Sequence, residues 1–306
     1  MIYADAVATI GRTPLVELGR LARGLQGRLL AKLEYRNPGG SIKDRVAVAL
    51  IDDAEERGVL RSGMTIIEPT GGNTGVGLAL VAAVRGYPLI LTMPQVMSVE
   101  RVALLRQLGA EVVLTPGILM GDAVDAARRL VEARDDAVML DQFSNPANAE
   151  IHRRTTAVEL WEDSGGAIDI LVCAVGTGGT ITGVGEFLKQ RNPNAQVVAV
   201  EPAGSALLSG GSSGPHQMPG IGVGFIPKIL NRTILDEVVT VTDEEAFGCA
   251  RRLAREEGIV AGVSSGAAVH AALQIAARPE SEGAVVVTVI PDTGERYITT
   301  ELFQHD

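Results

Sequence analysis

Two glycine-rich loops, each placed between a short apolar run and a helical pattern, constrain the fold of this 306-residue chain more than any other feature. The first loop, residues 68–75, follows the apolar run 64–67 and leads into the apolar helical segment 76–84. The second loop, residues 176–180, follows the apolar run 168–175. A strand that enters a helix through glycines leaves backbone N–H groups at the helix N-terminus, where they bind anions. The two loops therefore predict strand–loop–helix units with an anion site in each.

The rest of the chain also alternates between strand and helix patterns, which favours an α/β fold with largely parallel sheets. We predict strands at 29–33, 64–67, 88–92, 111–114, 138–140, 169–175, 196–200 and 284–289, and helices at 43–58, 75–85, 98–108, 122–134, 147–163, 183–190, 243–257 and 265–277. The length and the 46% hydrophobic content are sufficient for a large core, in one large domain or two moderate ones.

A third glycine-rich stretch, residues 37–45, places Lys43 at the start of a predicted helix. Apolar residues recur near helical spacing after it, and charged residues fill much of the other face. An isolated lysine at such a position is usually solvated, because lysine side chains are mostly exposed. The two anion loops favour a second interpretation, in which Lys43 anchors a cofactor covalently.

A dinucleotide site of the Rossmann type is the alternative for residues 176–180. Glu201 ends the next apolar run at about the offset of an acid that binds ribose. The pattern fails at its third glycine, because Ile181 stands where glycine or alanine is required after Gly176 and Gly178. We therefore favour a phosphate site over a dinucleotide site.

Charge and composition disfavour several other classes of function. A net charge of −10 argues against nucleic-acid binding, which needs a basic surface, and an aromatic content of 3% is too low for a base-stacking platform. The first residues lack the pattern of a targeting segment, and no apolar run approaches the ~18 residues of a transmembrane helix. We expect a soluble, cytoplasmic protein that binds neither nucleic acid nor membrane.

The cysteines and histidines do not have the spacing of a metal site. Cys173 and Cys249 are too far apart in the sequence for a disulfide framework or a structural zinc site. Cys173 lies in an apolar run, so we interpret it as a core residue. His216 lies in a glycine-rich loop, where we interpret it as a hydrogen-bonding residue of the loop rather than an acid or base. We predict no metal.

Nine motifs, in one order along nearly the whole chain, point to a known family. They lie at residues 10–16, 37–45, 68–75, 92–101, 142–148, 176–183, 214–227, 262–268 and 291–297. On these motifs the chain resembles the cysteine synthase (O-acetylserine sulfhydrylase) and cystathionine β-synthase family of fold-type II pyridoxal-phosphate enzymes. The resemblance implies two three-layer α/β domains, similar to the tryptophan synthase β subunit, with the cofactor in the cleft between them. The smaller, substrate-binding domain would comprise residues 35–145, and the larger, phosphate-binding domain residues 1–34 and 146–306.

The resemblance also implies which residues hold the cofactor, pyridoxal 5'-phosphate. Lys43 would carry it as a Schiff base and then, as a free amine, take the Cα proton of the substrate. Asn73 would hold the ring hydroxyl oxygen, and the phosphate would be bound by Gly176, Thr177, Gly178, Gly179 and Thr180. Ser264 would meet the pyridine nitrogen with a neutral hydroxyl, which makes the ring a weaker electron sink than a carboxylate would and favours β-elimination. The simpler alternative is that Ser264 or Ser265 only caps a helix.

Substrate-binding residues follow from the same resemblance. The α-carboxylate would be bound by Thr70, Gly71, Asn73, Thr74 and Gln142, and Gly220 and Val223 would lie in a loop near the open face of the cofactor. The chain departs from the family at two of these positions, because Gly71 replaces the usual serine and Val223 the usual alanine. Since Gly71 removes a hydroxyl donor, we expect Gly71→Ser to tighten substrate binding.

The implied reaction is elimination of acetate from O-acetyl-L-serine to an aminoacrylate intermediate, to which sulfide adds to give L-cysteine. Alternatives with the same cofactor are cysteine desulfhydrase activity and the synthesis of β-cyanoalanine, cystathionine or diaminopropionate. A non-catalytic binding protein is disfavoured by the presence of Lys43, Ser264 and both anion loops, and an oxidoreductase by the incomplete dinucleotide pattern. The family also implies a homodimer and, as a candidate partner, the C-terminus of a serine acetyltransferase.

Overall fold

The computed structural model describes residues 2–117 and 120–304, and the chain divides by its contacts into two compact units. Unit 1 comprises Met1–Ile10 and Asn37–Asn148, and unit 2 comprises Gly11–Arg36 and Ala149–Asp306. The division predicted from the sequence grouped the first ten residues with the larger domain. By contacts they belong to unit 1, because Val7 and Ile10 pack against the core of that unit.

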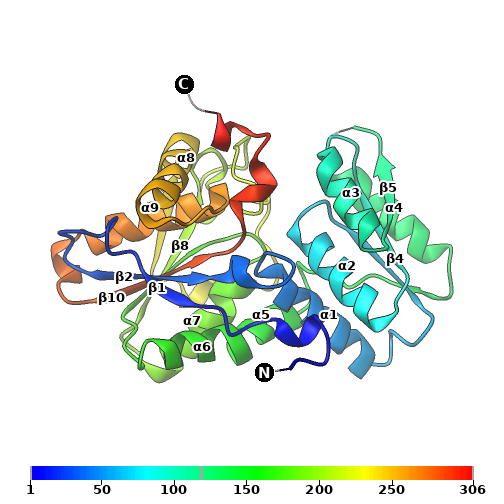
Figure 1. The fold of residues 1–306 in the computed structure, drawn as a ribbon, viewed down its shortest axis with the longest axis horizontal. Helices are drawn as coiled ribbons and strands as arrows, with labels where there is room; N and C mark the ends of the chain where they lie inside the picture. The colour runs from blue at the N-terminus through cyan, green and yellow to red at the C-terminus, as the bar shows by residue number, and fades with distance from the viewer. Residues whose placement is uncertain (1, 118–119, 305–306) are drawn as a thin grey trace. The chain divides into compact units, whose positions relative to one another are not determined.

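Unit 1 is built on a parallel four-stranded sheet in the order β5-β4-β3-β6 (Figure 1). The strands are β3 (Thr65–Pro69), β4 (Leu89–Pro94), β5 (Glu111–Thr115) and β6 (Ala137–Val138). The helices are α1 (Lys43–Glu56), α2 (Asn73–Arg85), α3 (Val99–Gln107) and α4 (Met120–Glu132), with a 3-10 turn at Val7–Thr9.

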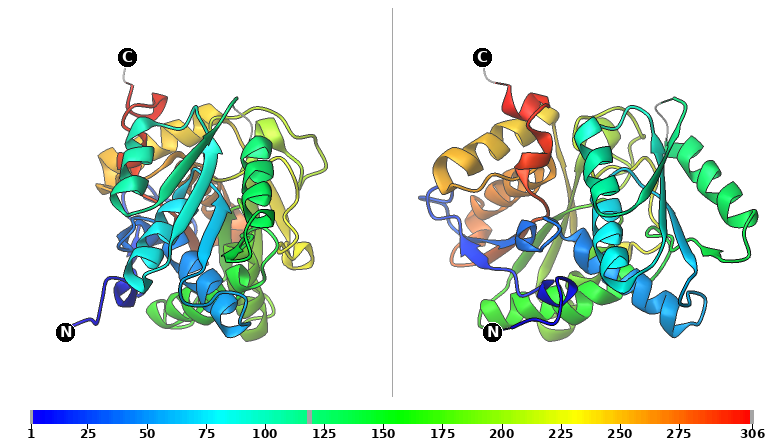
Figure 2. Two further views of the ribbon diagram at one scale, coloured as in Figure 1. Left: turned by 90° about the vertical axis from the view of Figure 1, so that its right-hand side faces the viewer. Right: turned by 45° about the vertical axis from the view of Figure 1, so that its right-hand side comes forward.

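Different helices cover the two faces of this sheet, which gives unit 1 three layers. Alternate strand residues point to opposite faces, so Ile66 packs with α1, α2 and α3, whereas Ile67 packs with α4. Figure 2 shows α4 across the sheet from α2 and α3. The central strands β3 and β4 are buried almost throughout, as is typical of a parallel sheet with both faces covered.

Unit 2 contains a six-stranded sheet in the order β1-β2-β10-β7-β8-β9, parallel except for β1, which runs antiparallel to β2. The strands are β1 (Leu15–Glu17), β2 (Arg28–Leu33), β7 (Ile170–Ala174), β8 (Gln196–Pro202), β9 (Glu237–Val241) and β10 (Val285–Ile290). The helices are α5 (Ala147–Ile151), which begins in unit 1, α6 (Ala157–Asp163), α7 (Gly179–Arg191), α8 (Asp243–Arg252) and α9 (Val263–Ala276). A π-helical turn at His152–Thr156 joins α5 to α6, and another at Leu253–Glu257 follows α8. Short 3-10 turns lie at Glu34–Arg36, Ala203–Ser205, Arg232–Ile234, Pro279–Ser281, Gly294–Tyr297 and Glu301–Phe303.

This sheet is also sandwiched between helices. α8 and α9 bury their apolar residues against one face, in a core that includes Val172, Val198 and Val286. α7 packs on β7 and β8, and Figure 1 shows it across the sheet from α8 and α9. The loops that enter α2 and α7 both follow the carboxyl ends of parallel strands, which is where open α/β sheets bind ligands.

The α/β class with two largely parallel sheets is confirmed, and the eight predicted strands are present with boundaries shifted by a few residues. β1 and β9 were not predicted, because β1 has three residues and β9 is a partly exposed edge strand without clear alternation. The predicted helix at 147–163 contains a π-helical turn, and the helix predicted at 183–190 begins earlier, at Gly179. In the ranges that the structure describes, no helix is both long enough and apolar enough to cross a membrane.

Candidate functional site

Lys43 is the first residue of α1, as the sequence predicted, and its backbone N–H donates to the Ser41 hydroxyl at 3.2 Å. The loop before Lys43 has a conformation that requires glycine at positions 39 and 40. Gly40 has φ of +76°, and a Cβ on Gly39 would collide with the Asp44 carboxylate, which accepts the Gly39 N–H at 2.6 Å. The side chain of Lys43 is partly exposed. The glycines thus place Lys43 at the start of a helix.

α1 and α2 cross closely at Lys43, and Gly77 permits the approach. A Cβ on Gly77 would lie 2.8 Å from the Lys43 carbonyl oxygen and 3.1 Å from the Ala47 Cβ. Asn73 is the first residue of α2, about one turn before Gly77. The crossing therefore holds the backbone of Lys43 beside the helix that carries Asn73 and the predicted carboxylate loop.

The other three lysines of the sequence have different surroundings. Lys32 is fully buried, and its Nζ donates to the Thr13 carbonyl oxygen at 2.6 Å and lies 2.9 Å from the Asp163 carboxylate. Lys189 pairs with Asp236 at 2.8 Å, and Lys228 is exposed. Of the four, Lys43 alone follows a glycine-rich loop at a helix start.

The predicted carboxylate loop connects β3 to α2, and the structure joins it to Gln142. The Thr74 hydroxyl donates to Gln142 Oε1 at 2.6 Å, although the two residues lie 68 positions apart. Thr70, Thr74 and Gln142 are buried, whereas Asn73 is partly exposed. The Thr70 hydroxyl accepts the Gly72 N–H at 3.3 Å. The loop therefore presents hydroxyl, amide and backbone N–H donors within unit 1, a set suited to a carboxylate.

Sequence reasoning gave no role to Glu68, which fixes the segment that carries Gln142. Glu68 lies on β3 and is 1% exposed, and its carboxylate accepts the N–H groups of Leu140, Asp141 and Gln142 at 3.0, 3.2 and 3.3 Å. Burial raises the pKa of Glu68 from 4.5 to about 7, against the lowering effect of the three N–H donors. An acidic residue at the end of an apolar strand was the available sequence signal.

In unit 2, the predicted phosphate loop forms a cradle that leaves no space for side chains. A Cβ on Gly176 would collide with the Gly220 carbonyl oxygen, and one on Gly178, which has φ of +84°, would lie 2.8 Å from the Leu230 Cβ. Gly178 is the N-cap of α7 and has no side chain to cap the helix, and the Thr177 hydroxyl accepts the Gly179 N–H at 3.4 Å. Thr180 places its hydroxyl 3.3 Å from His152 Nε2.

The loop that contains Gly220 and Val223 is attached to this cradle. The Gly222 N–H donates to the Val175 carbonyl oxygen at 3.1 Å, and Gly220 has φ of +90°. His216 lies 3.0 Å, by its Nε2, from the Gly222 carbonyl oxygen, which agrees with its interpretation as a hydrogen-bonding residue of the loop. Val223 lines a hollow together with Gly176. The structure thus places both predicted residues beside the phosphate loop.

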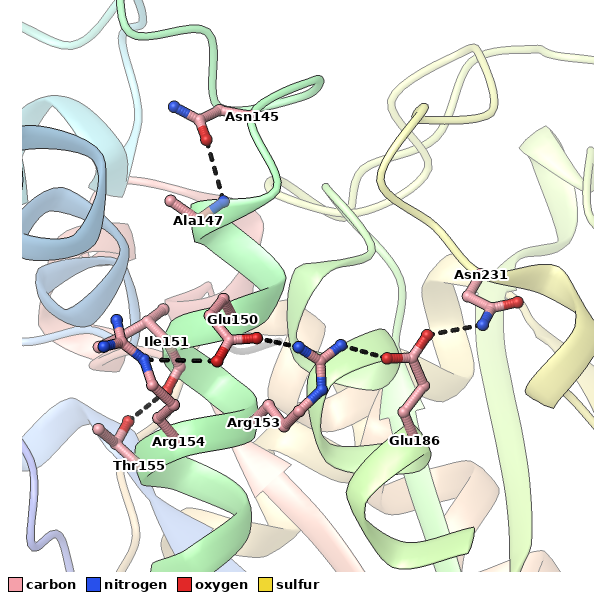
Figure 3. Close-up of polar contacts among 9 residues, drawn as sticks. All are labelled: Asn145, Ala147, Glu150, Ile151, Arg153, Arg154, Thr155, Glu186 and Asn231. Atoms are coloured by element: carbon pink, nitrogen blue, oxygen red, sulfur yellow. Dashed lines mark hydrogen bonds and ion pairs between the residues drawn. The ribbon is translucent and has the colours of Figure 1, made fainter. Parts of the chain in front are cut away.

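An ion-pair chain, which sequence reasoning missed, links the helix before β7 to α7 (Figure 3). The Arg153 guanidinium bridges the Glu150 and Glu186 carboxylates, and Glu186 also accepts from Asn231 Nδ2 at 2.6 Å. Beside it, a Cβ on Gly183 would collide with the backbone of the neighbouring helix. The opposite charges of Glu150 and Arg153 at i, i+3 were the only signal of this contact in the sequence.

Ser264 is the second residue of α9 and is 5% exposed. The N-cap is Gly262, where a Cβ would collide with the Asp292 carboxylate, so the interpretation of Ser264 or Ser265 as the cap is wrong. In the described part of the chain, the Ser264 hydroxyl makes no hydrogen bond. Ser264 therefore offers a neutral hydroxyl in the first turn of a helix.

Both cysteines are buried and unpaired, and burial raises the pKa of each thiol to about 12. This confirms the core interpretation of Cys173. Within residues 2–117 and 120–304, no group of acidic, histidine or cysteine side chains could hold a metal ion.

Comparisons with known proteins cover nearly the whole chain. Residues 7–292 match the family model described as pyridoxal-phosphate dependent enzyme. Cysteine synthase of Staphylococcus aureus is 49% identical over 299 residues, which are 97% of this chain and 96% of that protein. The crystal structure of cysteine synthase from Entamoeba histolytica is similar with a TM-score of 0.97 and 42% identity, over 100% of this chain and 92% of that one. The crystal structure of O-ureido-L-serine synthase is similar with a TM-score of 0.94 and 44% identity, over 99% of this chain and 96% of that one.

Proposed function

The chain belongs to the family of pyridoxal-phosphate dependent enzymes, and from this premise we propose that it is a cysteine synthase, which converts O-acetyl-L-serine and sulfide into L-cysteine and acetate. The observation that carries the proposal is the 49% identity to a cysteine synthase over 97% of the chain. Three features support it: Lys43 after a glycine-rich loop, the glycine-rich loop at the start of α7 and the buried Ser264.

The residues present fit pyridoxal phosphate. The loop 176–180 leads into the N-terminus of α7, where backbone N–H groups bind anions, and Thr177 and Thr180 add hydroxyl groups. When bound, pyridoxal phosphate supplies an electron sink that weakens the Cα–H bond of the substrate and allows the β-substituent to leave. Ser264 would meet the ring nitrogen with a neutral hydroxyl, which would keep that sink weak and suit elimination of a good leaving group.

Residues of this chain perform the remaining tasks. Lys43 Nζ would hold the cofactor covalently, and as a free amine it would take the proton from the substrate Cα. Asn73 would hold the hydroxyl oxygen of the cofactor ring. The donors of Thr70, Thr74 and Gln142 hold the substrate carboxylate, and Glu68 keeps Gln142 in place. Positioning the two reacting partners in this way lowers the entropic part of the barrier.

The test is to load the purified protein with pyridoxal phosphate, supply O-acetyl-L-serine and sulfide, and measure L-cysteine and acetate. We expect Lys43→Ala to lower the turnover by at least about a hundredfold, because the general base is lost. Lys228→Ala removes an exposed lysine and should leave turnover unchanged. Borohydride reduction followed by mass spectrometry should place the cofactor on Lys43 and not on Lys32, Lys189 or Lys228. Turnover that survives in Lys43→Ala would contradict the assignment.

A second candidate is β-replacement with a different nucleophile. It is favoured by the 44% identity to O-ureido-L-serine synthase and by the departures from the family at Gly71 and Val223. The same assay, repeated with cyanide, L-homocysteine, ammonia and N-hydroxyurea in place of sulfide, separates the candidates. A nucleophile that reacts much faster than sulfide would replace L-cysteine synthesis as the function, and release of sulfide from L-cysteine would indicate a desulfhydrase.

The assembly and the location extend this proposal. The family resemblance supports a cytoplasmic homodimer. Light scattering would measure its mass. The resemblance also supports a serine acetyltransferase as partner, whose C-terminal carboxylate would occupy the loop 70–74. A peptide with such a C-terminus should then compete with O-acetyl-L-serine, and the same peptide with an amidated C-terminus should not.

A further inference from the structure

Gly71 departs from the family pattern, and its backbone does not explain the departure. Gly71 is not among the glycines with positive φ, so its φ does not require glycine. A Cβ on Gly71 would lie 2.8 Å from Sδ and 2.9 Å from Cγ of Met97, and 3.3 Å from the Cβ of Met93. Real Cβ atoms essentially never approach other atoms within 3.0 Å. Met97 therefore fills the volume that a side chain at position 71 would need.

Met93 and Met97 differ in how readily they could move. Met93 lies on β4 and is fully buried, whereas Met97 follows β4, is partly exposed and packs against the edge of the same core. Arg101 on α3 places its Nη1 3.7 Å from Met97 Sδ. A serine at position 71 would thus displace the Met97 thioether from the core and from Arg101, and not Met93.

The contact joins two segments at the carboxyl ends of neighbouring parallel strands. β3 and β4 pair as far as Pro69 and Thr92, and the Thr70 N–H then donates to the Thr92 carbonyl oxygen at 3.0 Å. Gly71 follows on one side, and the turn that ends in Met97 follows on the other. The thioether of Met97 is therefore a wall of the loop that holds Thr70, Gly71 and Thr74.

We propose that Met97 is a specificity-determining residue of the amino-acid site and that it acts as a pair with Gly71. The pair places a thioether, which cannot donate a hydrogen bond, where the family resemblance implies a serine hydroxyl. Compared with the family pattern, the carboxylate loop thereby lacks one hydrogen-bond donor and is lined by one more apolar side chain. The inference rests on the proposed function in one respect, namely that this loop binds the carboxylate of an amino acid.

The pair reverses the effect of Gly71→Ser that the sequence led us to expect. The single substitution weakens amino-acid binding, because Met97 must leave a packed position before the serine fits. When Met97 is shortened to alanine in the same chain, the serine has space and its hydroxyl can serve the carboxylate. Gly71→Ser therefore weakens amino-acid binding when Met97 is present and does not weaken it when Met97 is replaced by alanine.

Four proteins test the pair: the wild type, Gly71→Ser, Met97→Ala and the double variant, each loaded with pyridoxal phosphate. L-Serine is titrated into each while the visible absorbance is followed, and the thermal unfolding midpoint is measured without amino acid. We expect Gly71→Ser to bind L-serine about tenfold more weakly than the wild type and to unfold at a lower temperature. The double variant should recover most of both losses.

Two matched variants control the comparison. Met64 is also partly exposed and packs on the same core, but it precedes β3, so Met64→Ala in the Gly71→Ser chain should recover neither loss. Gly72 has open space at its Cβ, so Gly72→Ser should not lower the unfolding midpoint. Undiminished L-serine binding by Gly71→Ser, or no recovery in the double variant, would overturn the inference. L-Cysteine formation by the wild type is measured separately, and its absence would contradict the proposed function but not the pair.

Discussion

At the scale of single residues, Glu68 shows how one buried carboxylate can position a binding segment. Its three N–H partners are consecutive residues, so it holds the backbone of 140–142 in one conformation, in which Asp141 has φ of +53°. A non-glycine residue with positive φ needs such support, because the conformation is strained. Gln142 reaches Thr74 from this fixed backbone.

The raised pKa of Glu68 predicts a pH-dependent stability. Between pH 4.5 and about 7 the folded protein keeps a proton on Glu68 that the unfolded chain has released. The stabilisation from this group is therefore complete below pH 4.5 and is lost as the pH rises through about 7, by about 3 kcal/mol in total. Urea unfolding at pH 5 and pH 8 should show this loss in the wild type and a smaller loss in Glu68→Gln.

The exposed Glu56 of α1 provides the control, since Glu56→Gln should keep the pH dependence of the wild type. Equal pH dependence in the wild type and in Glu68→Gln would show that Glu68 is ionised in the folded protein throughout this range.

At the scale of helices and strands, α7 follows the predicted phosphate loop and is held by both of its neighbours. Arg153 ties it to the helix before β7 through Glu186, and the Asn231 N–H donates to the Thr182 hydroxyl at 3.0 Å. Gly183 allows the two helix backbones to touch. These contacts fix the direction in which the N-terminal N–H groups of α7 point, and hence the phosphate cradle.

Arg153→Gln should therefore weaken pyridoxal phosphate binding. Removal of the guanidinium leaves Glu150 and Glu186 without their shared cation, so we expect a loss of about 1–2 kcal/mol in stability and a several-fold weaker affinity for the cofactor. Turnover at saturating cofactor should change little, because Arg153 does not touch the reacting atoms.

Arg154→Gln is the matched control, because Arg154 is the next residue and its ion pair with Glu150 has the longer distance of 3.6 Å. Cofactor titration and urea unfolding measure both variants. Equal effects of the two substitutions would show that the bridge to Glu186 does not position α7.

The elements that the sequence predicted share a strong local pattern. β7 and β8 are continuous apolar runs, and α1 begins where a glycine-rich loop meets helical spacing. The edge strand β9 is half polar, and its pairing with β8 depends on tertiary contact that periodicity does not express. The π-helical turn at His152–Thr156 depends likewise on the packing around it. In the site, Lys43 and the glycine loops were predictable, whereas Glu68, Met97 and Arg153 act through neighbours that are distant in the sequence.

At the scale of the whole molecule, the residues proposed to hold the cofactor are divided between the two units. Lys43 and Asn73 belong to unit 1, and Gly176, Thr180 and Ser264 belong to unit 2. Each unit has its own sheet and its own core. Under the proposed function, residues of both units therefore contribute to cofactor binding.

Removal of pyridoxal phosphate should therefore change how the whole protein unfolds. We expect calorimetry to show one transition for the loaded protein and two, or one at a lower temperature, for the protein without cofactor. A ligand present at a hundred to a thousand times its Kd contributes about 3–4 kcal/mol of stability. Addition of inorganic phosphate alone should restore only part of this effect, because it engages unit 2 but not Lys43. Identical transitions with and without cofactor would show that the cofactor stabilises neither unit.

Because the sequence contains four lysines, one of them can be labelled selectively. Lys32 is buried and paired with Asp163 and Glu159, and Lys189 is paired with Asp236. Under the proposed function, Lys43 is bound covalently to the cofactor. Among lysine side chains, an amine-directed dye or resin would therefore react first with Lys228. A fluorophore there would stand on the chain that follows Val223 and Phe225, where it could report ligand binding optically without any engineered cysteine.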